Sequence, residues 1–142
     1  MAKTLKIHSL ANKYIDRNEL LLHAAFQILR DFMEKENPNK HIDWNFEERQ
    51  AKAWREIKYL YRWWTKTRPA REDPILDPAV EMPPMMFEHC PSGGSRLIPY
   101  DRKKYAKYHK ASRAQLKAEA RWDKEDQENL HRLIDVRQYL WT

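Results

Sequence analysis

Hydrophobic and polar positions recur with a helical period in several stretches of the chain, and the clearest stretch runs from Asn45 to Pro69. At about 100° per residue, one arc of this stretch is apolar and the opposite arc is basic. Asn45 and Glu48 have the spacing of an N-terminal capping box, and Pro69 stops a helix. The pattern predicts a central helix over about residues 46–67 whose core-facing arc holds Phe46, Ala53, Trp54, Ile57, Leu60, Tyr61 and Trp64.

An earlier stretch predicts another helix over about residues 17–37, opened by Asp16 and stopped by Pro38. Its apolar positions cover nearly half of the circumference, which is typical of a core helix packed between two neighbours: Leu21, Leu22, Ala25, Phe26, Ile28, Leu29, Phe32 and Met33. His23 falls on the polar side and is interpreted as a solvated or edge histidine. Because a short Pro-Asn turn joins this helix to the central one, we expect an antiparallel pair.

The ends of the chain are less sharply patterned. Residues 4–10 alternate apolar and polar, which is compatible with a short strand or an extended arm on the core. Residues 102–140 favour helix, with Asp101 as a cap. One continuous helix would be about 58 Å long at about 1.5 Å per residue. The alternative is two helices, about residues 102–121 and 124–140, with a break near Trp122. Residues 110–119 are nearly all polar or alanine, so a helix there would project from the rest of the domain.

Residues 68–101 have a different composition, since seven of the eight prolines lie between Pro69 and Pro99. Their apolar residues are too numerous for a free linker, so we expect an ordered strap pressed onto the helices. Residues 86–90 and 96–98 flank a Pro-Ser-Gly-Gly turn, a pattern typical of a small β-hairpin. The predicted fold is therefore all-α: a single domain over residues 1–142, with three to four helices and a proline-rich strap that includes a hairpin.

The composition narrows the class of protein, its partners and its compartment. Six tryptophans and 42% hydrophobic residues favour a folded core, and the net charge of +6 favours polyanions or acidic protein surfaces as partners. The single cysteine, Cys90, excludes an internal disulfide and fits a reducing compartment. The longest apolar run, residues 20–26, is too short to cross a bilayer, so we expect a soluble protein with no membrane partner.

Three segments carry a resemblance to a known family. They are Ile42-Asp43-Trp44, then Glu56-Ile57-x-x-Leu60-Tyr61-x-Trp63-Trp64 with Arg68-Pro69-x-Arg71, and finally Asp126-Gln127-Glu128-x-Leu130-x-Arg132-Leu133-Ile134 with Leu140-Trp141-Thr142. Together they resemble an uncharacterised family of small proteins encoded by tailed bacteriophages. The resemblance implies a protein acting in the cytoplasm of an infected bacterial host or in the virion. The family has no assigned activity, so no residue role follows from it.

No catalytic signature is found. His89 and Cys90 are adjacent, but the chain lacks the C-x-x-C or H-x-x-x-H spacing of a metal site. The glycines Gly93 and Gly94 lack the lysine and the strand-to-helix context of a phosphate-binding loop, so a hairpin turn explains them. Acidic pairs such as Glu47-Glu48 suit the first turn of a helix. The sequence therefore predicts no enzyme, no metal and no cofactor.

The basic arc of the central helix is the predicted functional surface. Lys and Arg meet phosphates or carboxylates, and exposed aromatic rings can stack on bases. The predicted partner-binding residues are Lys52, Arg55, Lys58, Tyr59, Arg62, Trp63 and Lys66. We expect a helical interaction module that docks on a host or phage protein, with nucleic-acid binding by the same arc as the alternative. The C-terminal helical region also offers a surface for self-association.

Overall fold

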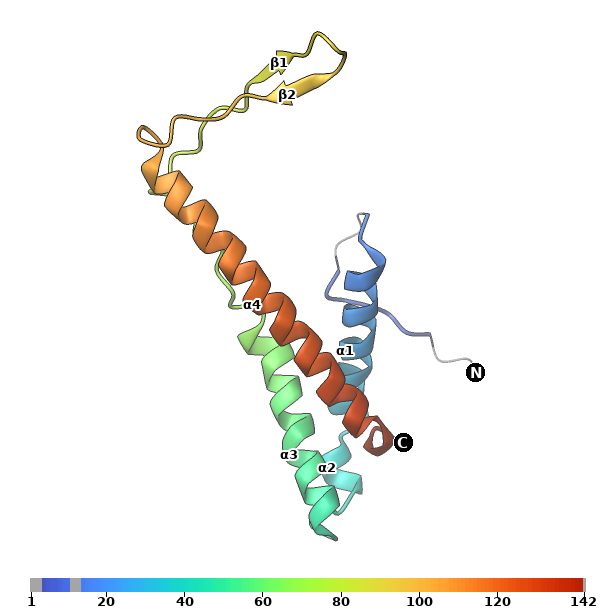
Figure 1. Ribbon diagram of the computed structural model, residues 1–142. Coiled ribbons are helices and arrows are strands. Elements are labelled where there is room, and N and C mark those ends of the chain that lie inside the picture. The colour runs from blue at the N-terminus through green and yellow to red at the C-terminus, as the bar shows by residue number, and fades with distance from the viewer. Residues whose placement is uncertain (1–3, 11–13, 142) are drawn as a thin grey trace. The chain divides into compact units, whose positions relative to one another are not determined.

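A computed structural model describes residues 4–10 and 14–141 and shows a mainly helical protein (Figure 1). Over these residues the three substantial helices are α1 (Arg17–Lys35), α3 (Glu48–Arg62) and α4 (Ala106–Val136). The shorter elements are α2 (Pro38–His41), a π-helical turn Trp63–Thr67, the 3₁₀ turns Pro74–Leu76 and Arg137–Tyr139, and the strands β1 (Phe87–His89) and β2 (Ser95–Leu97). The predicted fold class, all-α with a small hairpin, is confirmed.

The chain divides into two compact units. The first comprises residues 1–71 and 124–142, and the second comprises residues 72–123. Helix α4 runs through both, because the division falls at Asp123 within it. The single domain expected over residues 1–142 stays a prediction.

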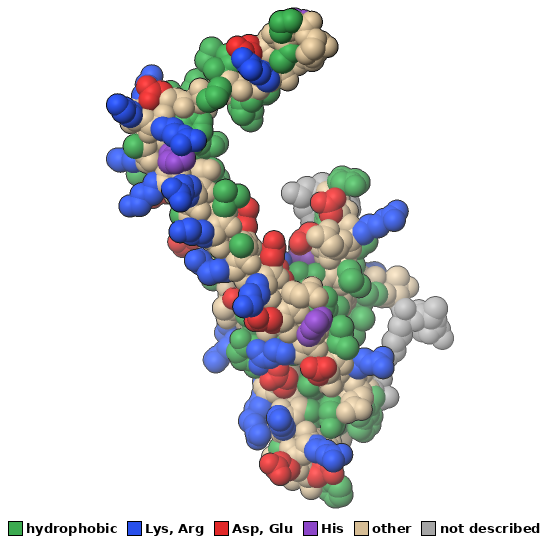
Figure 2. All heavy atoms as spheres, viewed as in Figure 1, with side chains coloured by type: hydrophobic (Ala, Val, Ile, Leu, Met, Phe, Trp, Pro, Cys, Tyr) green, Lys and Arg blue, Asp and Glu red, His purple; other side chains and the backbone are tan. Residues whose placement is uncertain are grey.

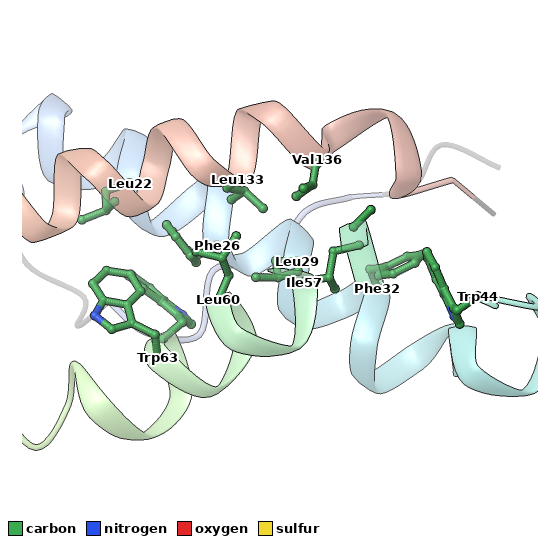
Figure 3. Close-up of a cluster of buried hydrophobic side chains, with 12 residues drawn as sticks. Leu22, Phe26, Leu29, Phe32, Trp44, Ile57, Leu60, Trp63, Leu133 and Val136 are labelled. Atoms are coloured by element: carbon green, nitrogen blue, oxygen red, sulfur yellow. The ribbon is translucent and has the colours of Figure 1, made fainter. Parts of the chain in front are cut away.

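In the first unit, α1, α3 and the C-terminal part of α4 pack around one hydrophobic core (Figure 3). Phe26 of α1 stacks on Trp64 at a ring-centroid distance of 4.6 Å, and Phe32, one and a half turns later, meets Trp44 ahead of α3. The start of α1 therefore lies beside the end of α3, which is the antiparallel arrangement predicted. Leu133 and Val136 of α4 are buried in the same cluster.

Helix α1 buries a narrower stripe than its pattern predicts. Leu22, Phe26, Leu29 and Phe32 are buried, whereas Leu21 and Ile28 are exposed. Of the two interpretations of His23, solvated or edge, the solvated one is wrong, because the end of α3 and Ser9 of the N-terminal arm cover it. Residues 4–10 form such an extended arm rather than a strand: the His8 backbone N–H donates to Gln27 Oε1 at 3.1 Å.

Both ends of α3 depart from the prediction. The capping box is wrong: Asn45 donates its backbone N–H to Asp43 Oδ1, the helix begins at Glu48, and Phe46 is 80% exposed. At the other end the last turn widens to a π-helix, in which the Arg68 N–H donates to the Trp63 carbonyl at 2.8 Å. Trp63 and Trp64 at the start of this turn are both buried, and both rings contact Phe26 of α1.

In the second unit the predicted hairpin is confirmed, with Phe87 paired to Leu97 and His89 to Ser95. Gly93 and Gly94 have φ values of 96° and 81°, which only glycine adopts without strain, and they allow the tight turn. The expectation that the strap's apolar residues are pressed onto helices is wrong for much of its length, because Leu76, Met82, Met85, Met86, Phe87 and Leu97 are exposed. Repeated prolines hold this stretch extended, which prevents it from folding back.

Helix α4 is continuous, so of the two arrangements left open by the sequence the break near Trp122 is wrong. Good helix formers without glycine or proline fill residues 110–124, and they outweigh the capping tendency of Asp123. Asp101 accepts the Lys103 and Lys104 backbone N–H groups, but in a turn, because the helix begins at Ala106 and not at the predicted residue 102. Within the second unit, Ala111 and Ala118 are buried on the side of α4 where Gln115 bonds to the strap.

Candidate functional site

The predicted functional surface lies along α3 and its π-helical turn. Tyr59 is 47% exposed, and Trp63 is only 3% exposed. The exposed cationic members are Lys52, Arg55, Lys58, Arg62 and Lys66, and these five residues are named here the α3 basic surface. Six of the seven predicted residues are therefore exposed, and the seventh, Trp63, is buried.

Trp63 cannot belong to a partner-binding surface, and its assignment there is wrong. Its indole N–H donates to Glu125 Oε1 at 2.5 Å, and its ring lies 5.3 Å from that of Phe26. The guanidinium of Arg71 covers the ring from another side at 5.8 Å. A regular helical period places Trp63 at the edge of the basic arc, and contacts with α1, α4 and Arg71 bury that edge.

Tyr59 is exposed, but its ring is already occupied on one face. The Arg132 guanidinium lies 4.1 Å from the ring centroid, a cation–π contact. Glu56 accepts hydrogen bonds from Arg132 through both carboxylate oxygens, one of them at 2.9 Å from Nη2. The bond to Glu56 is the main cause that raises the pKa of Arg132. These contacts hold the tyrosine ring, which leaves it poorly placed to stack on a base.

The α3 basic surface forms a stripe. Lys52, Arg55, Arg62 and Lys66 recur at intervals of three, seven and four residues, which places them on one side over about 21 Å of helix. Over the part of the chain that the structure describes, no ion pair joins any of the five to a carboxylate. Lys58 lies 5.5 Å from the centre of the Trp54 ring. The stripe therefore presents cations that the fold itself does not use for ion pairs.

A groove adjoins this stripe between α3 and the end of α4. It has a volume of about 440 Å³ and shares Lys52 with the α3 basic surface. Its charged lining is of both signs, with carboxylates from Glu56 and Asp135 as well as cations. Its apolar lining comes from Ala53, Val136 and Tyr139. The groove thus offers two charge signs and an apolar floor within the same unit.

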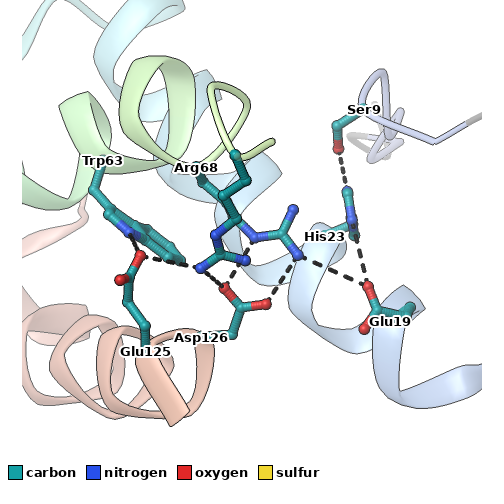
Figure 4. A network of polar contacts seen from close by, with 8 residues as sticks. Ser9, Glu19, His23, Trp63, Arg68, Glu125 and Asp126 are labelled. Atoms are coloured by element: carbon teal, nitrogen blue, oxygen red, sulfur yellow. Dashed lines mark hydrogen bonds and ion pairs between the residues drawn. The ribbon is translucent and has the colours of Figure 1, made fainter. Parts of the chain in front are cut away.

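A second set of polar residues joins α1, the end of α3 and α4 (Figure 4). Arg68 donates to both oxygens of Asp126, at 3.0 and 2.9 Å, and Arg71 donates to Asp126 at 2.8 Å and to Glu125 at 3.0 Å. This Arg68–Asp126 network also reaches α1, where Glu19 lies 3.9 Å from Arg68. The sequence analysis did not find it, because the residues are separated by more than 50 positions and no local spacing marks them.

The network shifts two pKa values. Burial alone would raise the pKa of Asp126, but the hydrogen bonds and charges of Arg68 and Arg71 outweigh it and hold that pKa below its ordinary range. Burial, helped by the charge of Arg68, lowers the pKa of His23. His23 pairs through Nδ1 with the Ser9 hydroxyl at 2.6 Å. Asp126, its two arginines and His23 join α1, the end of α3 and α4, and they are largely shielded from solvent. We therefore assign them to stability rather than to ligand binding.

Other chemistry gains no support from the geometry. Among the described residues, no group of three or more His, Cys, Asp or Glu side chains is placed to hold a metal ion. His89 and Cys90 lie at the end of β1 and in its turn. Across residues 4–10 and 14–141, no helix is long and apolar enough to cross a membrane. Comparison with protein-family models, curated proteins and solved structures finds no significant match.

Proposed function

We propose that this protein is a non-enzymatic interaction module that docks on an acidic region of a protein partner. The docking site consists of the α3 basic surface and the adjoining groove. The observation that carries this proposal is the composition of the groove, where carboxylates and an apolar floor lie beside the exposed cations. A protein surface supplies acidic, basic and apolar side chains together, which is the mixture that this lining complements.

The same observation weighs against a nucleic acid at this site. Glu56 in the groove is paired with Arg132, but Asp135 has no ion-pair partner among the described residues and would repel a phosphate backbone. Base stacking also lacks a free ring, because Trp63 is buried and Arg132 covers one face of Tyr59. Nucleic-acid binding by α3 remains the second candidate, supported by the row of five cations without ion-pair partners among the described residues.

The setting of the proposal rests on the resemblance to small tailed-phage proteins. In that setting the partner is a host protein or another phage protein, met in the cytoplasm of the infected bacterium or in the virion. Self-association through the C-terminal helical region stays a prediction, and sedimentation velocity over a range of concentrations tests it.

The test is affinity capture of the tagged protein from phage-infected cells, with nuclease digestion before elution. We expect a protein partner that survives digestion and is lost from the variant Lys52→Glu/Arg55→Glu. The matched control is Lys110→Glu/Arg113→Glu, which changes the net charge equally but lies on α4 in the other unit. Capture that is lost equally from both variants, or only after nuclease treatment, contradicts docking through α3.

A further inference from the structure

The N-terminal half of α4 carries a denser basic surface than α3. From residue 102 to residue 118 there is no Asp or Glu, and the basic residues are Arg102, Lys103, Lys104, Lys107, Lys110, Arg113 and Lys117. Blue side chains gather over this half of α4 in Figure 2. A groove of about 420 Å³ lies among them and is named here the α4 basic groove; its lining is Arg102, Ala106, His109, Lys110, Arg113, Ala114 and Lys117.

The groove lies on the side of α4 that the strap leaves open. Gln115 donates to Asp73 Oδ1 at 2.7 Å and accepts from the Ile75 backbone N–H at 3.4 Å, so the strap meets α4 on the side of Gln115. Ala111 and Ala118, one turn before and after Gln115, are buried on that side. At about 100° per residue, Arg113 and Lys117 point roughly the opposite way. The strap therefore holds one side of this segment and leaves the cationic side exposed.

The described residues supply no ion-pair partner for the cations that line this groove. In the first unit, arginines such as Arg68 and Arg132 are paired with carboxylates. Among the described residues, no ion pair joins Arg102, Lys110, Arg113 or Lys117 to a carboxylate. Like charges three or four residues apart on a helix repel each other, so a segment this basic is destabilised by its own charge. A bound polyanion would remove that repulsion.

We propose that the α4 basic groove binds the phosphate backbone of duplex nucleic acid. Ala106 and Ala114 keep its floor low, so a phosphate can approach the helix closely between longer cationic side chains. Residues 106–117 span about 17 Å, and a duplex presents one negative charge per about 1.7 Å of its axis. Several phosphates thus lie within reach of the four Lys and Arg side chains that line the groove. Without a groove side chain aimed at base edges, recognition is independent of sequence.

A nucleic acid fits this surface better than an acidic protein does. The α3 groove mixes charge signs, whereas the charged side chains lining the α4 basic groove are all cationic, apart from the ionisable His109. Tyr105 and Tyr108 pack edge-on against Tyr100 within the second unit, so they are not free rings for single-stranded bases. Duplex phosphates are the regular, purely anionic partner that such a lining complements. This binding adds a second ligand to the protein docking proposed above and does not depend on it.

The test is fluorescence anisotropy of the full chain with a labelled random DNA duplex of about 20 base pairs, titrated at several salt concentrations. Four phosphate contacts predict a log–log slope near −3.6, about −0.9 for each contact. In Lys110→Gln/Arg113→Gln the slope should fall to about −1.8, with affinity about one hundredfold weaker at about 50 mM salt. Circular dichroism checks that the variant remains helical. The matched control, Arg17→Gln/Lys40→Gln, removes the same charge at two exposed residues outside both basic surfaces and should change affinity less than about threefold.

Three results would overturn the proposal. The first is no duplex binding at about 50 mM salt, where electrostatic binding is strong. The second is an equal loss in the α4 variant and in Arg17→Gln/Lys40→Gln, which would mean that net charge alone drives binding. The third is displacement of the duplex by polyglutamate of equal charge at equal concentration, which would mean that any acidic polymer suffices. None of these results bears on capture of a protein partner by α3, so the two proposals can fail separately.

Discussion

At the scale of single residues, Trp64 is the anchor of the first unit. Its ring stacks on Phe26 at 4.6 Å and meets the edge of His23 at 4.9 Å. Removing a large buried ring leaves a cavity, so we predict that Trp64→Ala lowers the free energy of unfolding by about 3–5 kcal/mol, measured by urea denaturation. The control Leu116→Ala removes a side chain that is 65% exposed and should stay within about 0.5 kcal/mol. A Trp64→Ala protein as stable as the parent would contradict this core.

The lowered pKa of His23 predicts a pH dependence of stability. Since the folded state holds the pKa below 6.5, the unfolded chain takes up a proton first as the pH falls. The free energy of unfolding should therefore lose nothing to protonation of His23 above about pH 6.5, and it should decline as the pH falls below that value. Asp126, whose pKa is also lowered, loses its contribution only below about pH 3.8, outside that window. Denaturation of His23→Gln between about pH 5 and 7 should show a flatter profile than the parent, and an unchanged profile would assign the effect elsewhere.

Asp126 gives a third prediction. Arg68 and Arg71 both bond to its carboxylate, and all three side chains are largely shielded from solvent. Truncation to Asp126→Ala leaves a guanidinium without its carboxylate and should cost about 3 kcal/mol in thermal or urea unfolding. The apolar pair Arg68→Met/Asp126→Leu should recover part of that loss, because neither charge is then buried alone. If the double variant is no more stable than Asp126→Ala, the loss of stability does not come from leaving Arg68 buried without its carboxylate.

The residue scale also shows where the sequence is a poor guide. The five cations of the α3 basic surface are exposed as a regular helical period predicts. Trp63 and His23 are not, because segments distant in sequence cover both. Phe26 of α1 and Glu125 of α4 contact Trp63, while Ser9 and Trp64 contact His23. A long-range contact leaves no signal in residue spacing.

At the scale of elements, the packing of the strap on α4 is open to a direct test. Ala118 is 2% exposed on the side of α4 that bonds to residues 73–75. A larger side chain there has no space, so Ala118→Leu should displace the strap and speed hydrogen exchange of the Ile75 amide. The matched control Ala120→Leu changes an exposed alanine two residues away and should leave that exchange rate unchanged. Equal rates in both variants would mean that Ala118 does not support the strap.

Elements with strong periodicity or turn chemistry were predictable, and those that depend on what covers them were not. Apolar positions with a helical period, together with prolines, marked α1 and α3, and the glycine pair marked the hairpin. The continuity of α4 was left open, because Asp123 suits a cap as well as a helix interior. The exposure of Met85, Met86 and Phe87 was missed because apolar composition does not reveal whether a covering surface exists.

At the scale of the whole molecule, the net charge of +6 comes from basic residues of two kinds. Some form ion pairs with carboxylates, and others do not. In the first unit the Arg68–Asp126 network and the Arg132–Glu56 pair use arginines to join helices, and the α3 basic surface remains for a partner. In the second unit the basic residues of α4 have no such structural use among the described residues. We therefore propose one ligand for each of the two basic surfaces, a protein at α3 and nucleic acid at α4.

The most direct measurement quantifies protein partner and nucleic acid in the same eluate after capture from infected cells. It compares the parent with Lys52→Glu/Arg55→Glu and Lys110→Glu/Arg113→Glu, each of which lowers the net charge equally. The account predicts that the α3 variant loses the protein and keeps the nucleic acid, whereas the α4 variant keeps the protein and loses the nucleic acid. If both variants lose the same component to the same extent, the separate roles of the two surfaces are contradicted.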